Sequence, residues 1–110
     1  MANYQETLEQ DVVNATVVGD NTIIAAPGAG KYLAIDFLLF VPSADTTITF
    51  KKGVTPFSGA MPLKASQVAT IENAMKNEHG VLTCDDNQAF VINSTGGVLT
   101  GLIRYRIIGK

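Results

Sequence analysis

The chain has 110 residues, enough for one domain with a hydrophobic core and too few for two. Its net charge is −2 at pH 7 and its eight basic residues are scattered, which argues against a surface for nucleic acid or an anionic membrane. Charged residues make up 16% of the chain, against about 25% in ordinary soluble domains. We therefore expect part of the surface to be covered by another protein or a second copy.

The N-terminal segment, residues 1–18, has two possible structures. Residues 1–10 are polar, carry no basic and apolar secretion signal, and fit an extended arm. Residues 11–18 are rich in β-branched side chains, with Val12 and Val13 at their start. Either the segment lies against a neighbouring protein, with Val12 and Val13 in the contact, or residues 11–18 are the first strand of the domain formed by residues 19–110.

A short strand is predicted at 22–26, followed by the turn Gly28-Ala29-Gly30-Lys31, which looks like a phosphate-binding loop. That loop needs a glycine where Ala25 stands and a Ser or Thr where Tyr32 stands, and it should open a helix rather than a strand. We therefore interpret it as a hairpin turn and expect no nucleotide.

The strand predicted at 31–41 is apolar on both faces. A strand with one solvated face should be polar there, so the second face is a candidate contact with another subunit. Strict alternation places Leu33, Ile35, Phe37, Leu39 and Val41 on one face, and Tyr32, Ala34, Asp36, Leu38 and Phe40 on the other.

The remainder of the chain reads as further short strands. Residues 46–51 alternate with Ile48 and Phe50 inward, and residues 72–79 have room for one helical turn only. The other expected strands are 58–63, 68–71, 80–83, 88–92 and 98–108, the last with Leu99, Ile103, Tyr105 and Ile107 on one face. About eight strands at this spacing predict an all-β, antiparallel two-sheet sandwich that is jelly-roll-like.

The residues that carry chemistry elsewhere have no partners in this sequence. His79 is the only histidine, so a His-based metal cluster cannot form. Cys84 is the only cysteine, which suits a reducing cytosol, and the neighbouring Asp85 should raise rather than lower its pKa. The Asp85-Asp86-Asn87 run lacks the rest of a calcium loop and fits a turn. We expect no catalytic residue, no cofactor and no metal.

Three charges lie on long, otherwise apolar strands: Asp36, Arg104 and Arg106. They could form a cross-strand ion pair on an exposed face. They could equally form a pair inside a subunit interface, shielded by Tyr32, Leu38 and Phe40. The sequence leaves both readings open.

Residues 22–108 resemble a known family in strand order and turn chemistry. The shared features are Ala-Pro-Gly-Ala-Gly-Lys before YLAIDFLLFV, the strand TTITFKKG, the segment 58–63, QAFVINS at 88–94, the pair Gly96-Gly97 and a closing GLIRY. In these the chain is similar to the small β-sandwich virion proteins of tailed bacteriophages, above all those that decorate or cement the capsid.

The resemblance implies a non-enzymatic virion protein, made in the host cytoplasm and seated on the capsid surface. There a homo-oligomer, usually a trimer, would bridge major capsid proteins. The alternative is a fibre, knob or tail-tip domain that binds a host glycan or another virion protein, although the absence of Trp makes an aromatic sugar platform harder to build. A cupin-like enzyme would need a His-rich metal set, which one histidine cannot supply.

Overall fold

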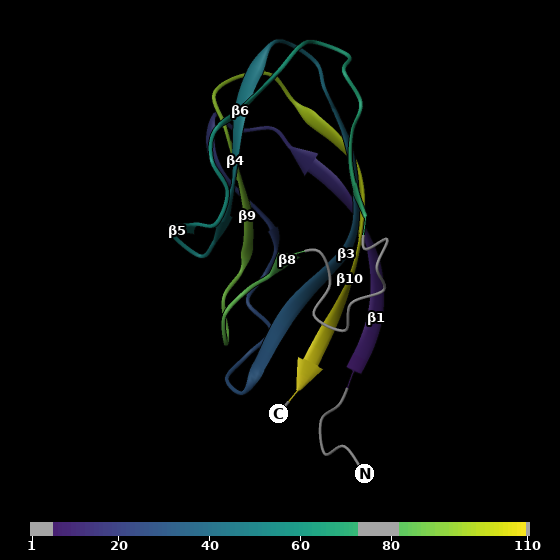
Figure 1. The fold of residues 1–110 in the computed structure, drawn as a ribbon, viewed down its shortest axis with the longest axis vertical. Helices are drawn as coiled ribbons and strands as arrows, with labels where there is room; N and C mark the ends of the chain where they lie inside the picture. The colour runs from purple at the N-terminus through teal and green to yellow at the C-terminus, as the bar shows by residue number, and fades with distance from the viewer. Residues whose placement is uncertain (1–5, 73–81, 110) are drawn as a thin grey trace.

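The computed structural model describes residues 6–72 and 82–109, which form two antiparallel sheets packed face to face (Figure 1). Sheet A has the order β1-β10-β3-β7, and β8 also pairs with β3. Its strands are β1 (Glu6–Ala15), β10 (Leu99–Gly109), β3 (Lys31–Pro42), β7 (Ala69–Glu72) and β8 (Leu82–Thr83).

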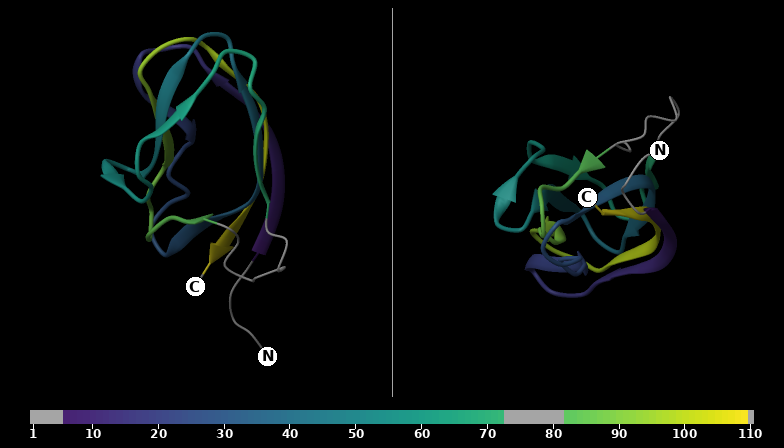
Figure 2. Two further views of the ribbon diagram at one scale, coloured as in Figure 1. Left: turned by 45° about the horizontal axis from the view of Figure 1, so that its top comes forward. Right: turned by 90° about the horizontal axis from the view of Figure 1, so that it is seen from below.

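Sheet B has the order β2-β9-β4-β5, and β6 also pairs with β4. Its strands are β2 (Gly19–Ile24), β9 (Phe90–Ser94), β4 (Thr46–Lys52), β5 (Thr55–Pro56) and β6 (Met61–Leu63). The views in Figure 2 show the two sheets as separate layers, with β1 and β10 in one and β4 and β9 in the other.

The connectivity is that of a jelly roll. When β5 and β6 count as one position beside β4, and β7 and β8 as one beside β3, eight positions remain. Numbered in chain order, these positions lie in the order 1-8-3-6 in sheet A and 2-7-4-5 in sheet B, which is the arrangement of two Greek keys in a jelly roll. The prediction of an all-β, two-sheet, jelly-roll-like sandwich is therefore confirmed. The predicted hairpin turn at Gly28–Lys31 is wrong. Because β2 pairs with β9 and β3 pairs with β10, this turn crosses from one sheet to the other.

β1 begins at Glu6 and pairs with β10 over its whole length, up to Ala15 opposite Leu99. Residues 6–10, expected in an arm, are therefore part of this strand. Val13 and Ala15 face inward and are buried, whereas Val12 is 68% exposed. The predicted place of Val13 in an outer contact is wrong, because its side chain fills the protein's own core.

A β-bulge in β3 exchanges the faces of that strand. Arg104 lies opposite Phe37 while Tyr105 lies opposite Ile35, so Asp36 is the extra residue. Before the bulge Leu33 and Ile35 face the core, and after it the even-numbered residues do. The strict alternation predicted for 31–41 is thus wrong beyond Asp36. Leu38 and Phe40, expected on an interface, are fully buried core residues.

The centre of the core is aromatic. Phe50 of β4 packs edge-on against Phe40 of β3, with ring centroids 6.3 Å apart, and lies 5.8 Å from Phe90 of β9. These rings join the two sheets, and edge-on contacts of this kind add to the burial of apolar surface. Ile48 and Phe50 face inward, as their alternation predicts.

Candidate interaction surface

The outer face of sheet A carries apolar side chains in register across three strands. Val12 of β1 is opposite Leu102 of β10, which is opposite Leu39 of β3. Leu39 and Leu102 are half-buried and Val12 is largely exposed. We call these three residues the apolar row; Phe37 and Val41 extend it along β3. A free-standing sandwich normally keeps its outer faces polar.

Arg104 is held in place beside this row. Its Nε donates to Oε1 of Gln10 at 2.8 Å, and its guanidinium carbon lies 5.9 Å from the centroid of the Phe37 ring. A guanidinium at this distance from a ring is attracted by the negative face of the aromatic system. The side chain is nevertheless exposed, so the face presents one positive charge amid apolar surface.

Arg106 and Asp36 form a two-bond ion pair on the same face. Nε of Arg106 donates to Asp36 Oδ2 at 2.7 Å and Nη2 to Oδ1 at 3.0 Å. Only 12% of the Arg106 side chain and 22% of the Asp36 side chain are exposed. The two residues form the cross-strand pair of the first alternative, although it is shielded from solvent rather than exposed, and a place inside a subunit interface stays a prediction.

The structure brings together five of the eight residues that the sequence singled out. Tyr32, Asp36, Arg104 and Arg106 share the outer face of sheet A with Val12, whereas Leu38, Phe40 and Val13 lie in the core. Sequence reasoning missed Leu39 and Phe37, because it assigned the odd residues of β3 to the core throughout. It also left out Leu102, which lies on the same face of β10 as Arg104. The signal was Asp36 itself, a charge in a strand with two apolar faces.

β1 is also the edge strand of sheet A. The backbone N–H of Val12 donates to Oδ1 of Asp11 at 2.8 Å, and so it points to the free side of the strand rather than toward β10. In an antiparallel ladder alternate residues bond to the same neighbour. The even-numbered residues of β1 therefore direct their backbone groups to the open edge.

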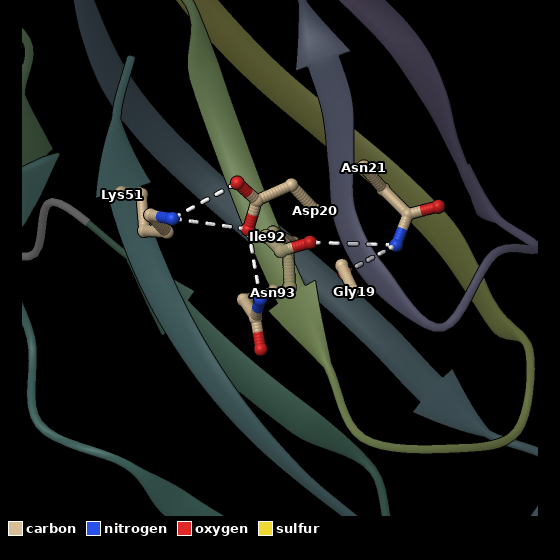
Figure 3. Close-up of polar contacts among 6 residues, drawn as sticks. All are labelled: Gly19, Asp20, Asn21, Lys51, Ile92 and Asn93. Carbon is tan, nitrogen blue, oxygen red and sulfur yellow. Dashed lines mark hydrogen bonds and ion pairs between the residues drawn. The ribbon is translucent and has the colours of Figure 1, made fainter. Parts of the chain in front are cut away.

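The outer face of sheet B is polar by contrast (Figure 3). Asp20 of β2 accepts hydrogen bonds from Lys51 Nζ at 2.9 and 3.1 Å and from Asn93 Nδ2 at 2.8 Å. The Asn93 bond and then the Lys51 bond hold the pKa of Asp20 below its usual value. Asn21 braces the β1–β2 turn by donating to the carbonyls of Val17 and Gly19. These polar groups therefore have hydrogen-bond partners within the chain, and the face that they form stays solvated.

Cys84 is buried, and the loss of solvation together with the nearby Asp85 raises its pKa to about 12. The thiol is therefore protonated at neutral pH, in agreement with its expected structural role. Asp85 pairs with Lys52 at 3.2 Å, and Asn87 accepts from the Gly28 backbone N–H at 2.9 Å. The loop that looked like a phosphate site is thus tied to the 85–88 turn. His79 and the helical turn considered at 72–79 lie in, or extend into, the part outside the described residues.

No three His, Cys, Asp or Glu side chains among the described residues gather in a way that could hold a metal ion. No helix in them is long and apolar enough to cross a membrane. An open hollow of about 370 Å³ lies at the ends of β4 and β6, with Leu63 and Thr95 among its lining residues.

No family model matches the chain, and no curated protein matches it either. One solved structure, described as "Bacillus endospore appendages form a novel family of disulfide-linked pili", is similar at a TM-score of 0.48 and 21% identity. The match covers 100% of this chain and 94% of that one. A likeness this distant carries no inference about assembly or function.

Proposed function

We propose that the chain is a structural virion protein that decorates a tailed-phage capsid and stabilises it by bridging major capsid proteins. It acts through protein contact and performs no chemistry. The proposal is supported by the resemblance of residues 22–108 to capsid decoration proteins and by the jelly-roll sandwich, which suits a small cementing subunit.

The observation that carries the proposal is the difference between the two outer faces. The face of sheet A presents the apolar row, whereas the face of sheet B presents the hydrogen-bonded Asp20, Lys51 and Asn93. A subunit that sits on a shell needs one face that gains from losing water and one that stays solvated. We therefore assign the capsid contact to the outer face of sheet A.

Such a subunit would stabilise the shell by mass action. A protein that binds the assembled lattice, and not the separated capsid proteins, shifts the equilibrium toward the assembled state. Arg104 adds a held positive charge to the contact, which favours a capsid surface with acidic residues around an apolar patch. The trimer implied by the resemblance is an alternative to a two-fold dimer, and the mass in solution distinguishes the two.

The first test is location. An antibody raised against the purified chain should label the capsids of particles released by cells that encode it, as seen by immunogold electron microscopy. Label confined to tails or fibres would support the fibre or tail-tip alternative instead. Label on no virion would contradict both.

The second test is the contact face. Leu39→Asp places a charge in the apolar row, and Thr49→Asp places one on the outer face of sheet B, where the side chain is similarly half-buried. Added to capsids stripped of the protein, Thr49→Asp should bind and raise their melting temperature as the unchanged chain does, whereas Leu39→Asp should not. Equal binding by the two variants would remove the outer face of sheet A from the contact.

A further inference from the structure

The sheet edges differ in how they are closed to further strands, and the edge of sheet A beside β3 consists of the short strands β7 and β8. Beside β4, the edge of sheet B consists of the short strands β5 and β6, which carry Pro56 and Pro62. The other edge of that sheet, β2, has a register irregularity between Thr22 and Ile24. Short strands, prolines and bulges are the usual protections against added strands.

β1 has none of these protections. It is ten residues long, carries no proline, and pairs with β10 without a shift in register. Among the described residues no other strand pairs with it. Its protection consists of the acidic residues Glu6, Glu9 and Asp11, and the carboxylate of Asp11 accepts the edge N–H of Val12 from an exposed position. Breaking this hydrogen bond costs little free energy, because water can hydrogen-bond to the exposed carboxylate instead.

The apolar row ends at this edge on its most exposed member. Leu39 and Leu102 are half-buried, while Val12, at the end of the row, is 68% exposed. The apolar row therefore ends at the edge strand β1. A further strand with an apolar residue opposite Val12 would extend the row.

We propose that a second copy of this chain occupies the edge, with the two β1 strands antiparallel about a two-fold axis through Val12. The charges exclude the centres from Glu9 to Asp11, and the edge-directed backbone of Val12 and its place at the end of the apolar row favour Val12 over the others. An axis through Glu9 or Asp11 would oppose each of these acids to itself, and one through Gln10 would oppose Glu9 to Asp11, both of which are destabilising. An axis through Val12 places Asp11 opposite Val13, Gln10 opposite Asn14 and Glu9 opposite Ala15.

The same axis satisfies the backbone. The edge-directed N–H and carbonyl of each Val12 would meet those of the other copy as a hydrogen-bonded pair. Gln10 and Asn14, which point their backbone groups the same way, would repeat this on both sides. The outer face then holds one continuous apolar row, from Leu39 through Leu102 and Val12 of one copy to the equivalent residues of the other. The proposed capsid contact uses the face and this contact uses the edge, so the dimer does not rest on the capsid role.

Sedimentation velocity over a micromolar concentration series tests the dimer. Val12→Lys opposes two like charges and should weaken association about tenfold or more, whereas Val54→Lys should leave it unchanged. Val54 is 83% exposed, far from β1 in the connection between β4 and β5, and so controls for the added charge. Asp11→Ala removes the carboxylate that accepts the Val12 N–H, together with its negative charge, and should raise the share of a discrete dimer, which the heterogeneous aggregates of a misfolded chain do not imitate.

Val12→Cys tests the register. Hydrogen-bonded antiparallel pairs have Cα atoms about 5.5 Å apart, within the range that a disulfide spans, so mild oxidation should link two copies. Val54→Cys should not form a linked dimer, and the buried Cys84 should form no disulfide in either variant. A monomer across the series, equal linking of the two variants, or a trimer indifferent to Val12→Lys would each overturn the proposal, because a two-fold contact alone closes a dimer.

Discussion

Asp36 and Arg106 are joined by two hydrogen bonds although the residue opposite Arg106 in the ladder is Ala34. The bulge makes this possible, because the extra residue turns the Asp36 side chain onto the face that Arg106 occupies. The bulge thus sets both the core face of β3 and the ion pair outside it.

We predict that Asp36→Asn lowers the free energy of unfolding by about 1–3 kcal/mol, since it leaves a shielded guanidinium with a weakened partner. Urea denaturation measures this. The matched control is Asp45→Asn, which breaks the exposed pair of Asp45 with Lys64 at 3.6 Å, and it should cost less because solvent already screens that pair. A smaller loss at Asp36 than at Asp45 would show that the bidentate geometry contributes nothing.

The exchange of faces in β3 makes a second prediction. Leu38→Ala should cost about 2–5 kcal/mol, as a fully buried leucine does, and Leu39→Ala clearly less, because Leu39 is half-buried on the outer face. Alternation without a bulge predicts the reverse order. Thermal unfolding of the two variants side by side distinguishes them.

Much of the fold could be predicted from the sequence, because it depends on patterns within single strands. Period-two alternation located the strand at 46–51, and its inward Ile48 and Phe50 are core residues. The outer contact could not be predicted in the same way. It depends on one extra residue at position 36, which exchanges the faces only because of how β3 pairs with β10, a strand some 70 positions away in the chain.

The connections were misread for a related reason. A turn such as Gly28–Lys31 has the same local chemistry whether it closes a hairpin or crosses between sheets. The pairing of β2 with β9 and of β3 with β10 decides between them, and both partners lie near the C-terminus. The pairing of strands far apart in the chain therefore decides which strands this turn connects, and the local sequence pattern does not.

Gly101 makes a third prediction. A Cβ on this residue of β10 would meet the carbonyl oxygen and carbon of Leu39 in the backbone of β3. Gly101→Ala should therefore lower the free energy of unfolding by about 1–3 kcal/mol, because the two strands must move apart. Gly59→Ala is the control, since no heavy atom lies within 4 Å of the added Cβ and its φ is not positive. Differential scanning calorimetry should show a lower melting temperature for the first variant alone, and equal melting temperatures would contradict the close approach of β10 to β3.

The last prediction concerns Cys84 and pH. Burial and Asp85 raise its pKa to about 12 from the ordinary value of 9.0. Between these values the unfolded chain has lost the thiol proton while the folded chain keeps it, so the unfolded state binds fewer protons and stability falls as the pH rises. The contribution is complete below pH 9 and is lost progressively as the pH approaches 12.

The native thiol should react slowly with a disulfide reagent at pH 8 and quickly in urea, because it is protonated and buried in the folded chain. Val54→Cys supplies an exposed thiol in the same chain, which should react at once. Urea titrations of the unchanged chain and of Cys84→Ala should show the steeper loss of stability above pH 9 in the unchanged chain. A native Cys84 as reactive as the thiol introduced by Val54→Cys would contradict the burial on which this prediction depends.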